Sequence, residues 1–124
     1  MGTTFSLTNK TRGTTPRVPF RLIKEKVLGK NYDLSVALIP PAQMRAITLK
    51  TKNKDKVSNV LAFPLAKHSG EILICPSAAE PYTVGYLFIH GCLHLKGHKH
   101  SDTMERIEHT WLKRFKLCKK SSQE

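Results

Sequence analysis

The stretch His-Gly-Cys-Leu-His-Leu-Lys-Gly-His-Lys-His, residues 90–100, gathers four of the chain's six histidines. His90 and His94 are four residues apart, so on a helix they lie on one face, one above the other. Gly97 is free to adopt the left-handed conformation that ends a helix, after which the chain can fold back. The stretch therefore predicts a helix followed by a turn that brings a third imidazole, from His98 or His100, to the first two.

This histidine pattern is typical of a catalytic zinc site, in which three neutral imidazoles leave one coordination position open. The spacing H-x3-H-x2-G-x2-H is the ligand skeleton of the metzincin peptidases, with His100 as the third ligand. Those enzymes place their general base, a glutamate, where this chain has Gly91. Because Gly97 should end the helix, we expect His100 rather than His98 to complete the site. The pattern thus predicts a metal centre that lacks the peptidase base.

Length, charge and cysteine content limit the kinds of partner that the chain can be expected to bind. The chain has 124 residues, a length that predicts one domain over residues 1–124, and a net charge of +12. Such a charge favours a polyanionic partner, and the absence of a free amphipathic helix favours nucleic acid over a membrane surface. No apolar run approaches the roughly 20 residues that span a bilayer, and the polar N-terminus predicts no signal peptide. Cys75, Cys92 and Cys118 form no C-x-x-C pair and lie in apolar stretches, as buried free thiols in a reducing cytoplasm do.

Hydrophobic periodicity predicts strands and helices in a mixed order. Alternating or continuous apolar residues indicate strands over residues 4–8, 32–39, 60–63 and 71–75. Helices are expected from Pro19 to Gly29, after Pro40-Pro41, over residues 82–96 with Pro81 at the first position, and from a cap at Ser101 or Asp102, with residues 119–124 frayed. The helix over residues 82–96 is apolar nearly all round, so it should be buried between layers. Its two histidines then need partners, which a metal supplies.

A lysine-rich stretch, Lys-Thr-Lys-Asn-Lys-Asp-Lys at residues 50–56, precedes the strand at residues 60–63. It has no apolar periodicity, which predicts a loop, and a basic loop at a strand end can lean over a cleft and hold phosphates. We expect these lysines and those beside the histidine turn to follow a nucleic-acid backbone: Lys50, Lys54, Lys56, Lys96 and Lys99.

Three motifs together resemble the YbeY family of bacterial and organellar endoribonucleases. They are the histidine run, residues 52–64 (Lys-Asn-Lys-Asp-Lys-Val-Ser-Asn-Val-Leu-Ala-Phe-Pro) and residues 70–74 (Gly-Glu-Ile-Leu-Ile). They keep the family order, and the resemblance covers roughly residues 3–118. It implies an α+β fold in which a small mixed four-stranded sheet is packed by about four helices and carries a histidine-rich helix-turn. It also implies one zinc ion on His90, His94 and His100, in a cleft open to single-stranded RNA.

The resemblance further implies a biological role and catalytic residues. The role is 3′-end maturation of small-subunit ribosomal RNA and ribosome quality control, with the small ribosomal subunit as partner. Lys52 aligns with the family's active-site arginine, and we expect it to stabilise charge on the phosphoryl oxygens. The family has Tyr-Asp where this chain has His98 and Lys99, which makes His98 a candidate general acid or base. Asn59 and Ala62 replace an aspartate and a serine.

Two alternatives stay open on the sequence. One is a catalytically weak RNA- or ribosome-binding module in which zinc is purely structural. The other is a zinc peptidase, which would need a carboxylate from elsewhere, Glu71 or Glu80, to act as base.

Overall fold

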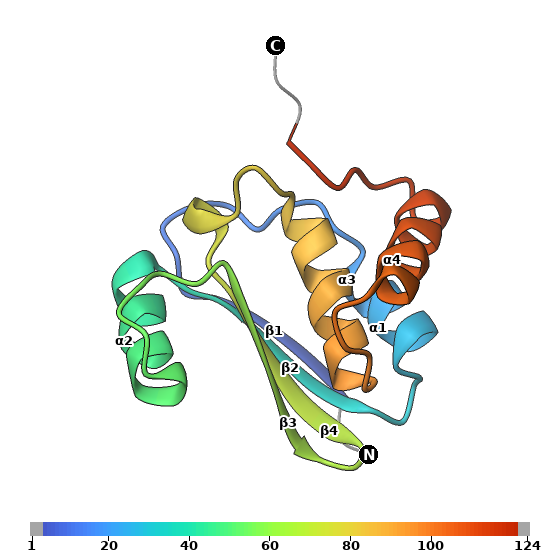
Figure 1. Ribbon diagram of the computed structural model, residues 1–124, viewed down its shortest axis with the longest axis horizontal. Coiled ribbons are helices and arrows are strands. Elements are labelled where there is room, and N and C mark those ends of the chain that lie inside the picture. Colours follow the sequence, from blue (N-terminus) through green and yellow to red (C-terminus); the bar gives the residue numbers. More distant parts are fainter. Residues whose placement is uncertain (1–3, 122–124) are drawn as a thin grey trace.

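A four-stranded mixed sheet of strand order β1-β2-β4-β3 forms the centre of the computed structural model, which describes residues 4–121 (Figure 1). Strands β1 (Phe5–Asn9), β2 (Asp33–Leu38) and β4 (Ser69–Ile74) are parallel, and β3 (Val60–Ala66) pairs with β4 in the antiparallel sense at one edge. The small mixed sheet predicted for the chain is confirmed.

Helices cover both faces of this sheet (Figure 1). Helices α1 (Phe20–Val27), α3 (Val84–Leu95) and α4 (Asp102–Arg114) lie on one side, and α2 (Pro41–Lys52) lies on the other. A short 3-10 turn, η1 (Pro76–Ala78), follows β4. The α+β class and the four helices are therefore as predicted.

Strand β4 shows why its sequence is apolar without alternation. Ile72 and Ile74 belong to the larger core, which lies beneath α3, whereas Leu73 points to the opposite face and packs in a smaller core with Met44 of α2. Successive side chains of a strand point to opposite faces, so the part of β4 that is covered on both sides, residues 72–74, is apolar at every position.

Helix α3 is buried along almost its whole length, as its apolar sequence predicts. It begins later than expected, because Thr83 and not Pro81 defines its start. The Thr83 hydroxyl accepts a hydrogen bond from the backbone N–H of Tyr86, at 3.1 Å. A threonine cap satisfies one of the backbone donors that the first turn of a helix leaves without a partner.

The end of α3 is set by Gly97, as predicted. Gly97 has a positive φ of 106°. Its N–H donates to the carbonyl of His94 and the N–H of His98 donates to the carbonyl of Leu93, both at 3.0 Å. These two bonds form a Schellman motif, in which a left-handed residue closes the helix and reverses the chain. The turn directs the following residues back along the helix.

The lysine-rich stretch begins inside α2, where the sequence predicts a loop. The helix continues through Lys52, and Asn53 ends it with a left-handed backbone, φ 56°. Lysine is a good helix former and its charge is favourable at a helix C-terminus. The prediction for residues 50–52 was wrong because these exposed positions need no apolar periodicity to remain helical.

The C-terminal part of the chain also departs from expectation. Helix α4 ends at Arg114, and Cys118 is exposed rather than buried on its apolar face. Residues 119–121 run beside the segment before α3, with hydrogen bonds from Thr83 N–H to the Lys119 carbonyl and from Ser121 N–H to the Pro81 carbonyl. The rest of the segment expected to fray, residues 122–124, lies outside the described residues. Among residues 4–121, no helix combines the length and apolar character that crossing a membrane requires.

Gly70 allows the close approach of β4 and the end of α3, which leads to a first prediction. A Cβ atom at this position would lie 2.6 Å from Tyr32 Oη and 3.0 Å from Leu95 Cδ2. We expect Gly70→Ala to lower the free energy of unfolding by about 1–3 kcal/mol, measured by urea denaturation. Gly13→Ala is the control, because its nearest neighbour, Thr11 Oγ1, is 3.9 Å away. Equal stabilities of the two variants would contradict the packing argument.

Candidate metal centre

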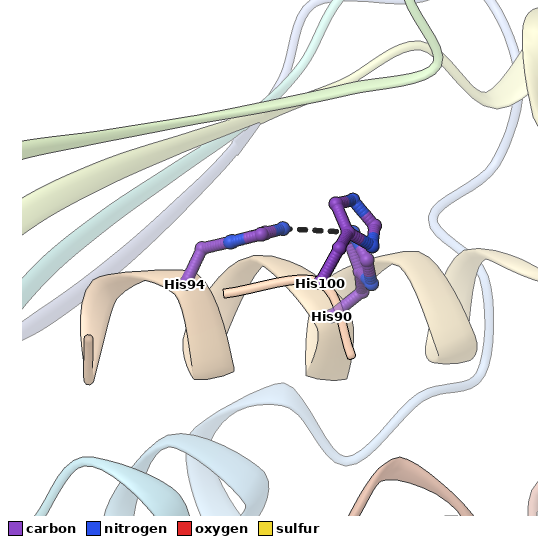
Figure 2. Close-up of side chains that lie close together, drawn as sticks. All are labelled: His90, His94 and His100. Atoms are coloured by element: carbon purple, nitrogen blue, oxygen red, sulfur yellow. Dashed lines mark hydrogen bonds between the residues drawn. The ribbon is translucent and has the colours of Figure 1, made fainter. Parts of the chain in front are cut away.

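The imidazoles of His90, His94 and His100 converge at one point (Figure 2). Their nearest nitrogens all lie within 4.8 Å of one another. His90 and His94 come from neighbouring turns of α3, and His100 comes from the segment that returns after Gly97. The predicted convergence of these three side chains is thus confirmed.

Hydrogen bonds to the rings fix which nitrogens are available. His90 Nδ1 lies 2.5 Å from Glu108 Oε2, and His94 Nδ1 lies 3.1 Å from the carbonyl oxygen of His98. Both partners are acceptors, so each Nδ1 carries the hydrogen and each Nε2 presents a lone pair. The two Nε2 atoms face each other at 3.0 Å.

This arrangement fits a metal ion. Two lone pairs that face each other cannot bond to each other, whereas a shared cation satisfies both. Burial, together with the neighbouring His90 ring, lowers the pKa of His94, so this ring is neutral and ready to act as a ligand at pH 7. The donor set of three imidazoles suits zinc and related divalent metals.

Glu108 orients the first of these rings, a role that the sequence did not predict. Its side chain is only 4% exposed, and it also accepts a hydrogen bond from the Tyr86 hydroxyl, at 3.3 Å. Burial and the nearby Glu108 carboxylate raise the pKa of Tyr86, which keeps the hydroxyl protonated and able to donate. Carboxylates that hold the outer nitrogen of a ligand histidine fix its tautomer and raise its basicity. The available signal was an acidic residue four positions from both Met104 and Leu112, on the buried face of α4.

A second prediction concerns this carboxylate. Glu108→Gln should weaken zinc binding by about 10- to 100-fold, because the amide can accept the His90 hydrogen bond but lacks the negative charge. Competition with a fluorescent chelator measures the affinity. Glu105→Gln, which changes an exposed acid one turn earlier in α4, is the matched control. If both variants bind zinc as the original chain does, Glu108 does not support the site.

The histidine cluster opens into a pocket of about 400 Å³, here called the metal pocket. A second pocket of about 430 Å³, the lysine pocket, adjoins it. Lys52, Asn59, Val60 and Leu61 line both, so the two form one groove along the edge strand β3 and the end of α2. One end of the groove is therefore lined by the three histidines.

The structure brings only some of the predicted RNA-contacting residues to this groove. Lys52 lines both pockets, and Lys54 and Lys56 line the lysine pocket. His98 is half-buried and contributes its carbonyl to His94, but it does not line the metal pocket. The remaining lysines are exposed and line neither pocket: Lys50, Lys96 and Lys99.

The loop that carries Lys54 and Lys56 is held against α2 at two points. Arg45 binds Asp55 through two contacts, of 2.6 and 3.0 Å. The buried Thr48 hydroxyl donates to Ser58 Oγ at 2.9 Å. These contacts preorganise the loop, so less conformational entropy is lost when its lysines bind an anion.

Gly91 explains why a peptidase base is missing at its usual place. A Cβ atom on Gly91 would lie 3.1 Å from Ile72 Cδ1, so this position faces the sheet and has no room for a longer side chain. Glu71 and Glu80 do not line the metal pocket, and the buried Glu108 is engaged with His90. Within residues 4–121, the geometry therefore gives the peptidase alternative no carboxylate as general base.

The fold and the site together define a small α+β protein with a three-histidine centre at the end of a basic groove. The chain belongs to the YbeY family, because the model of that family, described as Endoribonuclease YbeY, matches residues 7–116.

Comparison with individual proteins agrees with this assignment. An Endoribonuclease YbeY of Rubrobacter xylanophilus is 41% identical over 80 residues, covering 61% of this chain and 58% of that protein. Another, from Finegoldia magna, is 30% identical over 94 residues, covering 62% of this chain and 61% of that protein. The matches thus span about three fifths of the length of these relatives. The solution structure of TM1509 from Thermotoga maritima has a similar fold, with a TM-score of 0.63 and 21% identity over 90% of this chain and 88% of that one.

Proposed function

We propose that this chain is a zinc-dependent endoribonuclease that cleaves single-stranded RNA in the groove formed by the metal and lysine pockets. The observation that carries the proposal is the convergence of His90, His94 and His100 at the end of a groove lined by lysines. Family membership supports it, since the curated relatives are described as endoribonucleases. The exposed His100 and the pocket beside the cluster favour an open, catalytic site over a closed, structural one.

The three histidines would hold one zinc ion per chain. When bound, zinc supplies Lewis-acid polarisation of a phosphodiester oxygen or of a water molecule. Glu108 and the His98 carbonyl keep the protons of His90 and His94 on Nδ1, which would leave both Nε2 atoms available to hold the ion.

Lys52 is the residue that we propose to stabilise the reacting phosphate. It stands on the last turn of α2 and lines the metal pocket, and its Nζ lies 5.6 Å from the centre of the Phe63 ring. A cation–π contact of this kind limits the positions of an otherwise mobile ammonium group. A fixed positive charge next to the scissile group stabilises the negative charge that develops on the phosphoryl oxygens.

The other basic residues bind the RNA backbone in this proposal. Lys54 and Lys56 contact phosphates in the lysine pocket, while Lys50, Lys96 and Lys99 add to the positive potential that attracts RNA. His98 is proposed to transfer a proton during cleavage, because it precedes the ligand His100 on the same turn.

We further propose the biological setting that the family resemblance implies. The substrate would be ribosomal RNA, with maturation of the 3′ end of small-subunit RNA and ribosome quality control as the processes served. The small ribosomal subunit would be the partner, and the cytoplasm the location.

A cleavage assay tests the proposed activity. Purified chain is incubated with an unstructured fluorescent RNA and with the same RNA as a duplex, with EDTA and with zinc added back. We expect cleavage of the single strand alone, lost in EDTA and restored by zinc. Cleavage that is insensitive to EDTA would contradict the proposal. Tight binding without cleavage would instead support the RNA-binding module with structural zinc.

A further inference from the structure

A third pocket, here called the N-terminal pocket, lies at the carboxyl ends of β1, β2 and β4, and shares no lining residue with the groove described above. Its volume is about 580 Å³, within the range of small-ligand sites. The lining residues are Lys10, Thr11, Arg12, Gly13, Ile39, Pro40, Pro41, Pro76 and Ser77.

The floor of this pocket is apolar and rigid. Ile39 is almost fully buried and continues the smaller core, and its N–H donates to the Ile74 carbonyl at 2.9 Å. Pro40, Pro41 and Pro76 line the same pocket. Proline rings fix the backbone, so such a surface changes little when a flat ligand packs on it.

The rim of the pocket is positively charged and is not neutralised. Lys10 and Arg12 are exposed, and within residues 4–121 neither side chain forms an ion pair or a hydrogen bond. Among the residues that the structure describes, no acidic one lines the pocket. The rim therefore presents two free cations beside an apolar floor.

The loop that carries these cations is held in place. The Lys10 N–H donates to the Leu38 carbonyl at 2.8 Å. Asn9 accepts from the Thr11 N–H at 2.9 Å through its side-chain oxygen, and its amide group donates to the Gly13 carbonyl at 3.0 Å. The backbone around Lys10 and Arg12 is thus ordered before any ligand binds.

We propose that the N-terminal pocket binds one nucleotide of the single-stranded RNA, at a distance from the site of cleavage. The base packs on the floor of Ile39 and the prolines, and the phosphate binds Lys10 and Arg12, whose guanidinium matches two phosphate oxygens. This inference rests on the proposed function, since it extends the path of the same substrate.

The 3-10 turn η1 connects the lysine pocket to the N-terminal pocket. Its last residue, Ala78, lines the lysine pocket, and its first residues, Pro76 and Ser77, line the N-terminal pocket. An RNA chain that leaves the lysine pocket along η1 therefore reaches the N-terminal pocket. The pocket is predicted to lengthen the RNA footprint without taking part in the reaction.

Binding of short and long RNA tests the inference. Fluorescence anisotropy in EDTA compares an unstructured 4-nucleotide RNA with a 12-nucleotide RNA. The double variant Lys10→Ala, Arg12→Ala should bind the longer RNA about tenfold more weakly and the shorter RNA almost unchanged. The control Lys26→Ala, Lys67→Ala removes the same charge from exposed positions that line none of the three pockets, and should weaken binding of the longer RNA much less.

The outcomes separate this inference from the proposed function. If the 4-nucleotide RNA binds and is cleaved with zinc, but the 12-nucleotide RNA binds no better, the inference is wrong and the function stands. Equal losses of affinity for the 12-nucleotide RNA in the two double variants would overturn the inference as well. If the original chain binds neither RNA, both the inference and the proposed function are wrong. A competition experiment compares oligoglutamate with an unlabelled RNA of equal charge as competitors of the longer RNA. If oligoglutamate displaces the longer RNA at the lower concentration, the pocket binds acidic peptides and the inference is wrong.

Discussion

Replacement of His94 by alanine is expected to abolish zinc binding and to reduce RNA cleavage by a factor on the order of 10³ or more, while the chain stays folded. The variant removes one of the two Nε2 atoms that face each other at 3.0 Å. Loss of the metal removes several kcal/mol of Lewis-acid stabilisation, and each 1.36 kcal/mol corresponds to about a tenfold change in rate. Zinc content by mass spectrometry, cleavage rate and circular dichroism provide the three measurements.

His109→Ala is the matched control for this experiment. His109 is an exposed histidine on α4 and lies outside the three-histidine cluster. It should keep full zinc content and activity. Unfolding of the His94 variant, with the control intact, would show that the ion holds the fold together and would support the structural-zinc alternative, because a structural site contributes its binding energy to folding.

Replacement of Lys52 by alanine should reduce the cleavage rate about 10²- to 10³-fold with zinc binding unchanged. The reason is that Lys52 supplies fixed positive charge in the metal pocket but is not a ligand. Single-turnover kinetics at saturating RNA separate this effect on the chemical step from an effect on binding.

Two further variants sharpen the test of Lys52. Lys52→Arg should retain most activity, because arginine keeps the charge and adds bidentate phosphate geometry. Lys26→Ala is the control, since Lys26 is likewise an exposed lysine on the last turn of a helix, but one far from the groove in sequence and outside its lining. If the Lys52→Ala and Lys26→Ala variants cleave RNA at the same rate, Lys52 does not take part in the reaction.

The histidine cluster could be predicted from the sequence because its geometry is mostly local. The four-residue spacing of His90 and His94 and the helix end at Gly97 depend on backbone geometry within a few turns. The strand over residues 71–75 could be predicted for a similar reason, since a short apolar run between turn residues is itself a local pattern.

Features that depend on how elements pack against one another could not be predicted in this way. Glu108 was missed because only the packing of α4 against the rest of the fold buries its carboxylate beside His90. The groove joins Lys52 to His94 across more than forty residues of sequence. No local pattern indicates that the end of α2, the edge of β3 and the middle of α3 meet at one site.

The central claim is that three imidazoles hold one zinc ion and leave a position free for substrate. Anomalous diffraction from crystals of the zinc-loaded chain, recorded on both sides of the zinc edge, tests it most directly. The account predicts one peak per chain, about 2.0–2.1 Å from a nitrogen of each of His90, His94 and His100, with no protein atom as the fourth ligand. No peak at this position, or a fourth protein ligand that closes the site, would contradict it.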